Sequence, residues 1–339
     1  MSAMTTRVAV IGAGGVARRH VEVLSGLPGV AVTAVTDPVR DSAESLASLC
    51  GATAHQSVDE ALEGAEVDAV YVCVPPFAHG EPEKAVLARG LPLFVEKPLA
   101  VGLEVAEEIA RLAAETGVVT GTGYHWRCMR EVAVAAELIA SSPVVLANGY
   151  WLDKRPPVAW WAHSDRSGGQ VVEQLTHVLD LARVLLGEAE EVYAVGARRA
   201  ARPDQAADEP AAERGDVDDA TAATVRFCSG AVATFAATSV LGVKHRAGLH
   251  MFSTGMTLEM SEQGLVVDAG TTTREHHRPA EDPRGVVDRE FIEAVRGERA
   301  GTRAPYSEAL RSHRLACAIA QSARVGRPVQ VPQLQSSMP

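Results

Sequence analysis

The sequence predicts an α/β protein with two domains, the first built on a doubly wound parallel sheet. The chain has 339 residues, which is more than one compact core usually holds. Valine-rich apolar runs alternate with amphipathic segments up to Thr122, as they do where helices cover both faces of a parallel sheet. The composition, 47% hydrophobic and 22% charged, is that of a globular chain.

The elements of the first domain are expected to follow one another as strand and helix. Apolar runs predict strands at 7–11, 30–36, 67–76, 92–96 and 117–122. Amphipathic spacing predicts helices at 16–24, 41–50, 81–89 and 103–116. The first domain is therefore expected to span residues 1–123 and the second 124–339.

The net charge and the cysteine content indicate which classes of partner and which kinds of site to expect. The formal net charge of −11 argues against nucleic acid, and no apolar run is long enough to cross a membrane. The five cysteines are odd in number and include no C-x-x-C pair, so neither disulfides nor a metal site is expected. These features predict a cytoplasmic protein whose partner is a small molecule.

A glycine-rich turn follows the first predicted strand. Gly12-Ala13-Gly14-Gly15-Val16-Ala17 reads G-x-G-x-x-A and opens a predicted helix. Gly12 permits the tight turn, Gly14 lets backbone amides approach a pyrophosphate, and Ala17 lets helix pack on strand. A merely flexible turn is the alternative, but the strand, the helix and the later Asp37 favour dinucleotide binding.

Asp37 ends the second predicted strand, where a carboxylate can accept both ribose hydroxyls of an adenosine. A carboxylate there would repel a 2′-phosphate, so NAD is the expected cofactor. Arg40 lies three residues further on and could meet such a phosphate, which leaves NADP open. Alternatively, Arg40 is simply an exposed charged residue at the start of a helix.

Two further strand ends are expected to face the cofactor, because ligands of doubly wound sheets lie beyond the carboxyl ends of the strands. The segment "VCVPPFAHG" supplies Val74, Pro75 and His79, and "FVEKP" supplies Glu96 and Lys97. We expect the polar side chains among them to line the nicotinamide end of the site. For Lys97 the alternative is a surface lysine before a turn.

A second group of polar residues lies on a predicted helix at 171–186, which Gly187 ends. Helical spacing places Glu173, His177 and Asp180 opposite an apolar stripe. Glu173 and His177 could be an ordinary i, i+4 pair on a solvated face. Alternatively the imidazole, whose ordinary pKa suits proton transfer near neutrality, serves as a catalytic base.

Three stretches together resemble the Gfo/Idh/MocA oxidoreductase family, which includes glucose-fructose oxidoreductase and inositol dehydrogenases. They are the glycine turn, "VPPFAHGEPEKAVLARGLPLFVEKPLA" and "SGGQVVEQLTHVLDLARVLLG". The resemblance covers nearly the whole chain. It implies a Rossmann domain, then an α/β domain with a large, open, mostly antiparallel sheet, and assembly into homodimers or homotetramers.

The resemblance also implies roles for individual residues. Lys97 of the E-K-P motif would contact the hydroxyl that is oxidised, and Pro98 would follow a cis bond. His177 would be the acid/base residue. Glu173 stands where the family usually has aspartate, so whether it orients the imidazole or reaches the substrate stays open.

Other residues are expected in the substrate pocket. The family often has an asparagine and an arginine after the last Rossmann strand, where this chain has His125 and Arg127, so the arginine matches and the asparagine does not. We expect Tyr124, His125 and Arg127 to line the pocket. The alternative is a purely structural crossover between domains. Trp161 lies in "YWLDKRPPVAWWAH", whose aromatic rings could stack on a sugar or simply fill the core.

Three later segments have structural interpretations only. Residues 198–219 are rich in alanine, proline and charge and predict a surface loop. Residues 220–240 alternate around Ser229-Gly230 and predict a hairpin. His276 and His277 lie in a polar stretch that predicts a solvated loop.

The leading hypothesis is an NAD-dependent dehydrogenase that acts on a secondary hydroxyl of a sugar, polyol or cyclitol. One alternative is a glycoside-cleaving or epimerising enzyme in which bound NAD is reduced and regenerated within each turnover. Another is an inactive protein that senses a dinucleotide. The presence of both Lys97 and His177 speaks against the last, because an inactive site needs neither.

Overall fold

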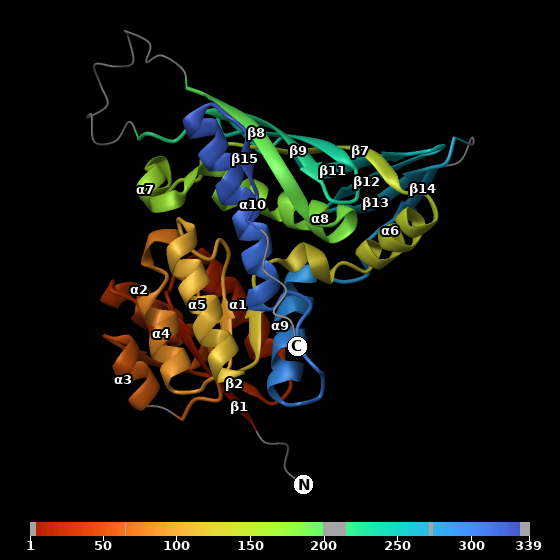
Figure 1. The fold of residues 1–339 in the computed structure, drawn as a ribbon. Helices are drawn as coiled ribbons and strands as arrows, with labels where there is room; N and C mark the ends of the chain where they lie inside the picture. The colour runs from red at the N-terminus through yellow and green to blue at the C-terminus, as the bar shows by residue number, and fades with distance from the viewer. Residues whose placement is uncertain (1–4, 65, 199–214, 271–273, 333–339) are drawn as a thin grey trace. The chain divides into compact units, whose positions relative to one another are not determined.

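The computed structural model describes residues 5–64, 66–198, 215–270 and 274–332 (Figure 1). The chain forms two compact units. The first comprises Met1–Ala100, Glu104–Cys128 and Glu281–Leu310, and the second Val101–Leu103, Met129–Ala280 and Arg311–Pro339. The sequence-based division gave everything after residue 123 to the second domain, whereas these units return the segment Glu281–Leu310 to the first.

The first unit contains a six-stranded parallel sheet in the order β3-β2-β1-β4-β5-β6, which confirms the predicted doubly wound fold. The strands are β1 (Thr6–Ile11), β2 (Val30–Thr36), β3 (Thr53–His55), β4 (Ala69–Val72), β5 (Leu93–Val95) and β6 (Thr120–Thr122). The helices are α1 (Gly15–Gly26), α2 (Arg40–Cys50), α3 (Val58–Glu63), α4 (Glu81–Ala88), α5 (Leu103–Thr116) and α9 (Pro283–Val295). Short η1 (Pro76–Ala78) and η2 (His125–Cys128) follow β4 and β6. Neither β3 nor α3 was expected.

Both faces of this sheet are buried, which explains why its strands are apolar along their whole length. In β1, Val8 and Val10 belong to one apolar cluster, and Ala9 and Ile11 belong to another. Helices α1, α2 and α9 contribute to the first cluster, and α3, α4 and α5 to the second. Polar side chains can therefore leave the sheet only at the strand ends.

Helix α9 belongs to the first unit although it comes from the C-terminal part of the chain. Phe291 on this helix packs edge-on against the rings of Tyr71 in β4 and Phe94 in β5, with centroid distances of 5.3 and 5.5 Å. All three side chains are fully buried. The segment thus completes the core on the α1 side of the sheet.

The second unit contains a nine-stranded mixed sheet in the order β14-β13-β12-β11-β7-β10-β9-β8-β15. Its strands are β7 (Val144–Leu152), β8 (Ala189–Ala197), β9 (Ala220–Phe227), β10 (Val232–Thr238), β11 (Arg246–Ser253), β12 (Met256–Ser261), β13 (Gly264–Asp268), β14 (Arg274–His277) and β15 (Val329–Gln330). Only β7 and β10 pair in parallel among these neighbours. The large, mostly antiparallel sheet and the hairpin at 220–240 are therefore confirmed.

Helices of the second unit precede and follow these strands. They are α6 (Arg130–Ser141), η3 (Ala159–Ala162), α7 (Ser164–Ser167), η4 (Val171–Leu175), α8 (Thr176–Leu186) and α10 (Tyr306–Val325), of which α10 begins in the first unit. Helix α8 packs on β7 and β11, and Gly187 ends it with φ +91°. The helix expected at 171–186 is thus present, with a π-helical first turn.

The solvated polar face considered for this helix is wrong, because His177 and Asp180 are 5% and 1% exposed. Asp180 Oδ1 accepts a hydrogen bond of 2.5 Å from the hydroxyl of Ser312 on α10. A second element of the same unit therefore covers the side of α8 that spacing alone predicted to face water.

The loop predicted around His276 and His277 is also wrong, since both residues lie in β14, an edge strand that pairs antiparallel with β13. Most of the loop expected at 198–219 falls on 199–214, outside the described residues. Among the residues that the structure describes, no helix is both long and apolar enough to cross a membrane.

Gly149 in β7 provides a test of the second unit's core. A Cβ added there would lie 2.4 Å from the ring of Phe235 in β10, so Gly149→Ala is expected to lower the free energy of unfolding by about 1–3 kcal/mol through overpacking. The measurement is urea unfolding followed by circular dichroism. Gly242→Ala, whose Cβ would meet no atom within 4 Å, is the matched control. Equal stability of the two variants would contradict the packing described.

Candidate active site

The glycine turn packs tightly against the ends of three strands. Gly12 has φ +94°, and its amide donates to the carbonyl of Thr36 at 2.8 Å. A Cβ at this position would lie 2.6 Å from the carbonyl oxygen of Cys73. Both the backbone angle and the space therefore require glycine here.

The N-terminus of α1 is open at the next residues of the turn. Gly14 is the N-cap residue, no side chain caps the helix, and a Cβ added at Gly14 or Gly15 would meet nothing within 4 Å. Ala17 is fully buried against the sheet, while Val16 is partly exposed. Uncapped amides at a helix N-terminus with open space before them are suited to bind a pyrophosphate.

Asp37 connects this turn to the end of β2. Its Oδ2 accepts from the amide of Ala13 and its Oδ1 from the amide of Val39, both at 2.8 Å. Each carboxylate oxygen retains acceptor capacity for a further donor, as recognition of ribose hydroxyls requires. The carboxylate is thus already oriented by the backbone.

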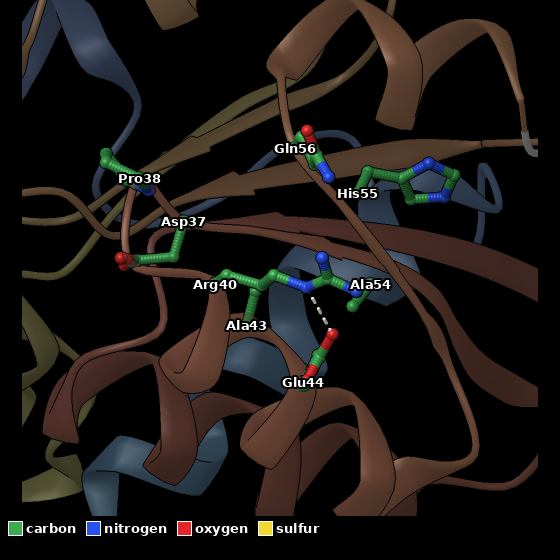
Figure 2. A pocket seen from close by; sticks show the side chains of 8 residues that line it. All are labelled: Asp37, Pro38, Arg40, Ala43, Glu44, Ala54, His55 and Gln56. Carbon is green, nitrogen blue, oxygen red and sulfur yellow. Dashed lines mark hydrogen bonds and ion pairs between the residues drawn. The ribbon is translucent and has the colours of Figure 1, made fainter.

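A cavity of about 270 Å³ lies beside Asp37 (Figure 2). Its lining residues are Asp37, Pro38, Arg40, Ala43, Glu44, Ala54, His55 and Gln56. Arg40 Nε donates to Glu44 Oε1 at 2.7 Å, and Figure 2 shows Asp37 directed away from this pair. The guanidinium of Arg40 is therefore neutralised by a neighbour on its own helix, and both side chains are well exposed.

The segment after β4 places Val74 and Pro75 half-buried at the strand end. His79 is buried, and its Nδ1 lies 2.5 Å from Oε1 of Glu83 in the first turn of α4. The other oxygen of Glu83 accepts from the amide of Gly80 at 2.6 Å. His79 thus lies at the predicted edge of the sheet, held by a helix-capping carboxylate.

Glu96 is directed into the first unit rather than toward solvent. It is 4% exposed, its Oε1 lies 2.9 Å from Nε2 of His20 on α1, and its Oε2 accepts from the amide of Lys97 at 2.9 Å. Burial raises the pKa of Glu96, but the hydrogen bond and charge of His20 outweigh it and lower the pKa to about 2. Glu96 is therefore a carboxylate at neutral pH.

Sequence reasoning missed His20. Burial lowers the pKa of His20, but the charges and hydrogen bonds of Asp288 and Glu96 outweigh it and raise the pKa to about 9. A signal was present, because Ala17, His20, Val21 and Leu24 form the buried stripe of α1 at helical spacing. A histidine inside such a stripe needs a buried partner.

Lys97 follows Glu96 at the carboxyl end of β5 and is half-buried. Its peptide bond to Pro98 is cis, as the family resemblance implied. The backbone amide of Lys97 is fixed by the Glu96 carboxylate, so the residue leaves the sheet in a defined direction.

The three residues expected after β6 differ in environment. Tyr124 is fully buried within the apolar cluster formed with α3, α4 and α5. This burial favours a structural role for Tyr124 over contact with the substrate. His125 is half-buried, with Nδ1 3.3 Å from the carbonyl of Gly123. Arg127 is 8% exposed and lies 3.5 Å from the carboxylate of Glu308. Their contact with substrate stays a prediction.

The second unit holds the other predicted site residues, and Glu173 and His177 each contact a tryptophan. Glu173 on η4 accepts a hydrogen bond of 2.9 Å from the indole of Trp161, which is itself buried. The ring of His177 on α8 stacks on Trp151 of β7, with centroids 5.8 Å apart and planes inclined by 24°. Two tryptophans therefore hold the carboxylate and the imidazole in place.

Sequence reasoning also missed Asp153 and Lys244, which surround Trp151. The indole of Trp151 donates to Asp153 at 3.2 Å, and the amine of Lys244 lies 4.5 Å from the ring centroid. Neither residue lies in a recognisable motif. Across the described ranges, no group of three or more histidine, cysteine or acidic side chains is arranged to hold a metal ion.

Comparisons with known proteins agree with this geometry. Residues 6–124 match the model of the Gfo/Idh/MocA N-terminal domain, described as an oxidoreductase family with an NAD-binding Rossmann fold. Residues 141–259 match the C-terminal domain of the same family. Levoglucosan dehydrogenase in complex with NADH has the same fold, with a TM-score of 0.86 at 20% identity over 98% of this chain and 100% of that one.

Two curated relatives are dehydrogenases of inositols. The scyllo-inositol 2-dehydrogenase (NAD(+)) of Bacillus subtilis (strain 168) is 30% identical over 53% of this chain and 54% of its own length. An inositol 2-dehydrogenase of Streptomyces avermitilis is 34% identical over 53% of each chain. The chain thus spans about half the length of these relatives. The two domain matches and the glycine turn, E-K-P motif and α8 histidine show that the chain belongs to the Gfo/Idh/MocA oxidoreductase family.

Proposed function

We propose that the protein is an NAD-dependent dehydrogenase that interconverts a secondary hydroxyl and a ketone on a sugar, polyol or cyclitol. The observation that carries this proposal is the placement of Lys97 at the carboxyl end of β5, in the same unit as the uncapped α1 N-terminus and Asp37. Ligands of doubly wound sheets bind at this edge. Glu173 and His177 of the second unit supply the acid/base group.

The residues of the first unit fit a dinucleotide. The amides of Gly14 and Gly15 would receive the pyrophosphate, Asp37 would accept the ribose hydroxyls, and the cavity beside it would hold the adenosine. We propose that Val74, Pro75 and His79 contact the nicotinamide half. Bound NAD would supply the acceptor for the hydride that leaves the substrate carbon.

Two side chains would handle the substrate hydroxyl. In the oxidation direction the imidazole of His177 takes the hydroxyl proton, and the ammonium of Lys97 stabilises the negative charge that develops on oxygen. In reduction the roles reverse. Glu173, oriented by Trp161, would keep the helix turn before His177 in place. Lys97 belongs to the first unit and His177 to the second.

The substrate class rests on the relatives. Trp161 is 1% exposed and Trp151 is 7% exposed with His177 stacked on its ring, so these indoles support the acid/base residues and the core interpretation of Trp161 is favoured over stacking on a sugar. The similar proteins are named for inositols and levoglucosan. We therefore propose a cyclic polyhydroxylated substrate, with His125 and Arg127 as further polar contacts.

The first test replaces the two proposed chemical groups. Lys97→Ala and His177→Ala are each expected to lower kcat/KM by about 10²–10⁴-fold, because each removes a group that acts in the transition state. Turnover is measured as NADH absorbance with myo-inositol, scyllo-inositol, levoglucosan and common sugars. Lys84→Ala and His276→Ala serve as matched controls outside the site.

If both variants retain the activity of the native protein, the catalytic roles proposed for Lys97 and His177 are wrong. Product formation without net NADH, together with cofactor that stays bound through gel filtration, would instead favour a glycoside-cleaving or epimerising reaction. NADH binding with no turnover of any compound would favour the dinucleotide-sensing alternative.

The second test concerns cofactor choice. Asp37→Asn removes the charge but keeps an acceptor for the backbone, so NADH binding is expected to weaken about tenfold and NADPH binding to strengthen. Glu44→Gln in that background releases Arg40 and should strengthen NADPH binding further. Fluorescence titration measures both dissociation constants, with Asp41→Asn as control. Unchanged discrimination would show that Asp37 does not read the ribose.

We further propose that the protein forms a homodimer or homotetramer through the face of the nine-stranded sheet opposite α8. Several apolar side chains on that face are 40–48% exposed in the single chain, and a second copy of the chain would cover them. They include Leu146, Tyr193, Val195 and Val232.

The proposed interface is tested by introducing charged side chains on this face of the sheet. Val195→Glu with Val232→Glu is expected to shift the mass measured by light scattering to that of one chain, 35.7 kDa, because buried unpaired carboxylates oppose association. Val243→Glu, at a loop position 71% exposed, is the control. An unchanged assembly would place the interface elsewhere.

The cysteines support a reducing compartment, for which we propose the cytoplasm. All five lie in the described residues, and none forms a disulfide. Cys73 and Cys128 are buried, and burial raises the pKa of both thiols, so neither is a reactive thiolate.

A further inference from the structure

A chain of three buried ionisable side chains runs through the first unit and ends at the backbone of Lys97. Asp288 Oδ1 lies 2.7 Å from Nδ1 of His20, and His20 Nε2 lies 2.9 Å from Oε1 of Glu96. The other oxygen of Glu96 accepts from the amide of Lys97 at 2.9 Å. We call Asp288, His20 and Glu96 the buried relay.

The buried relay connects three separate elements. Asp288 comes from α9, His20 from α1, and Glu96 from the end of β5, and the three residues are 1%, 1% and 4% exposed. Charged groups in such surroundings lose their hydration, and a buried ion pair seldom stabilises a fold more than apolar side chains of the same size would. Stability alone therefore does not account for a relay at this place.

The carboxylate at the end of the relay is fixed on every described side. A Cβ added at Gly123, directly after β6, would lie 2.4 Å from both oxygens of Glu96, so the carboxylate fills the space that glycine leaves. Arg19 Nη2 lies 3.5 Å from Oε1. Together with His20 and the Lys97 amide, these contacts leave Glu96 one orientation.

We propose that His20 and Asp288 are positioning residues for Lys97, acting through the Glu96 carboxylate that holds the Lys97 amide. Asp288 orients the imidazole, the imidazolium orients the carboxylate, and the carboxylate fixes the backbone from which the amine extends. The inference rests on the proposed function, in which Lys97 contacts the reacting oxygen. Errors of about 1 Å in such a group can cost on the order of a hundredfold in rate.

The first experiment needs no substrate. The sequence contains only four lysines, Lys84, Lys97, Lys154 and Lys244, so brief acetylation with an N-hydroxysuccinimide ester followed by mass spectrometry follows each amine separately. Asp288→Asn and His20→Gln are expected to raise the labelling of Lys97 relative to Lys84 several-fold. Asp68→Asn, which breaks the Arg7–Asp68 pair at the opposite ends of the strands, should leave the ratio unchanged.

Gly123→Ala gives an independent perturbation that removes no charge. Its added Cβ displaces the Glu96 carboxylate, so Lys97 labelling should rise as it does in the relay variants. If Asp288→Asn does not fold, Gly123→Ala still tests whether the Glu96 carboxylate positions Lys97. An unchanged labelling ratio in the folded relay variants and in Gly123→Ala would overturn the proposal.

The second experiment is a double-mutant cycle on whichever compound of the screening panel the native protein turns over. Asp288→Asn is expected to lower kcat by roughly tenfold to a hundredfold with little change in NADH affinity, and to have almost no effect in a Lys97→Ala background. The same loss in both backgrounds would mean that Asp288 only stabilises the fold, which overturns the inference. If Lys97→Ala alone costs nothing, the proposed function fails instead, and the labelling result still judges the relay.

Discussion

Covering both faces of the parallel sheet is the constraint on which the rest of the first unit depends. Alternate residues of β1 lie in different apolar clusters, so no polar side chain can leave the strand along its length. Polar side chains gather at the strand ends: the Arg7–Asp68 pair lies at the amino ends, and the glycine turn, Asp37 and the Glu96-Lys97 pair lie at the carboxyl ends. The position of the candidate site is thus a consequence of how the sheet is buried.

In the second unit, the candidate acid/base residues are placed by helix α8, which packs on β7 and β11. Glu173 and His177 lie on or just before this helix, and indole rings fix both of them. Stacking on Trp151 fixes the plane of the His177 ring, and the two ring nitrogens lie at the edge of that plane. This arrangement suits a group that must exchange a proton repeatedly without changing its orientation.

Much of the first unit was predictable because the signal for a buried parallel strand is strong and local. The apolar runs identified β1, β2, β4, β5 and β6, whereas the sequence around β3 contains no such run. Edge strand β14 was mistaken for a loop because its exposed residues, Arg274 to His277, carry no apolar alternation. The burial of Asp180 was missed because its cover, Ser312, lies more than a hundred residues away in sequence.

In the candidate site, too, local sequence patterns were informative and contacts between distant residues were not. Motifs predicted Lys97, Asp37 and the Glu173-His177 pair as site residues, because each lies in a local pattern. His20 was readable as a polar residue within an apolar stripe, but its partner Asp288 was not, since a helical period says nothing about which sheet the helix will cover. Lys244 depends on a loop conformation that composition does not specify.

The return of residues 281–310 to the first unit has a consequence for biosynthesis. A ribosome delivers the six strands of the parallel sheet early, but Phe291 and Asp288 emerge only after the entire nine-stranded sheet except β15 has been translated. Until then the rings of Tyr71 and Phe94 and the charge of His20 have no cover from α9. The core on the α1 side of the parallel sheet is therefore complete only after α9, which follows β14 in the chain, has been synthesised.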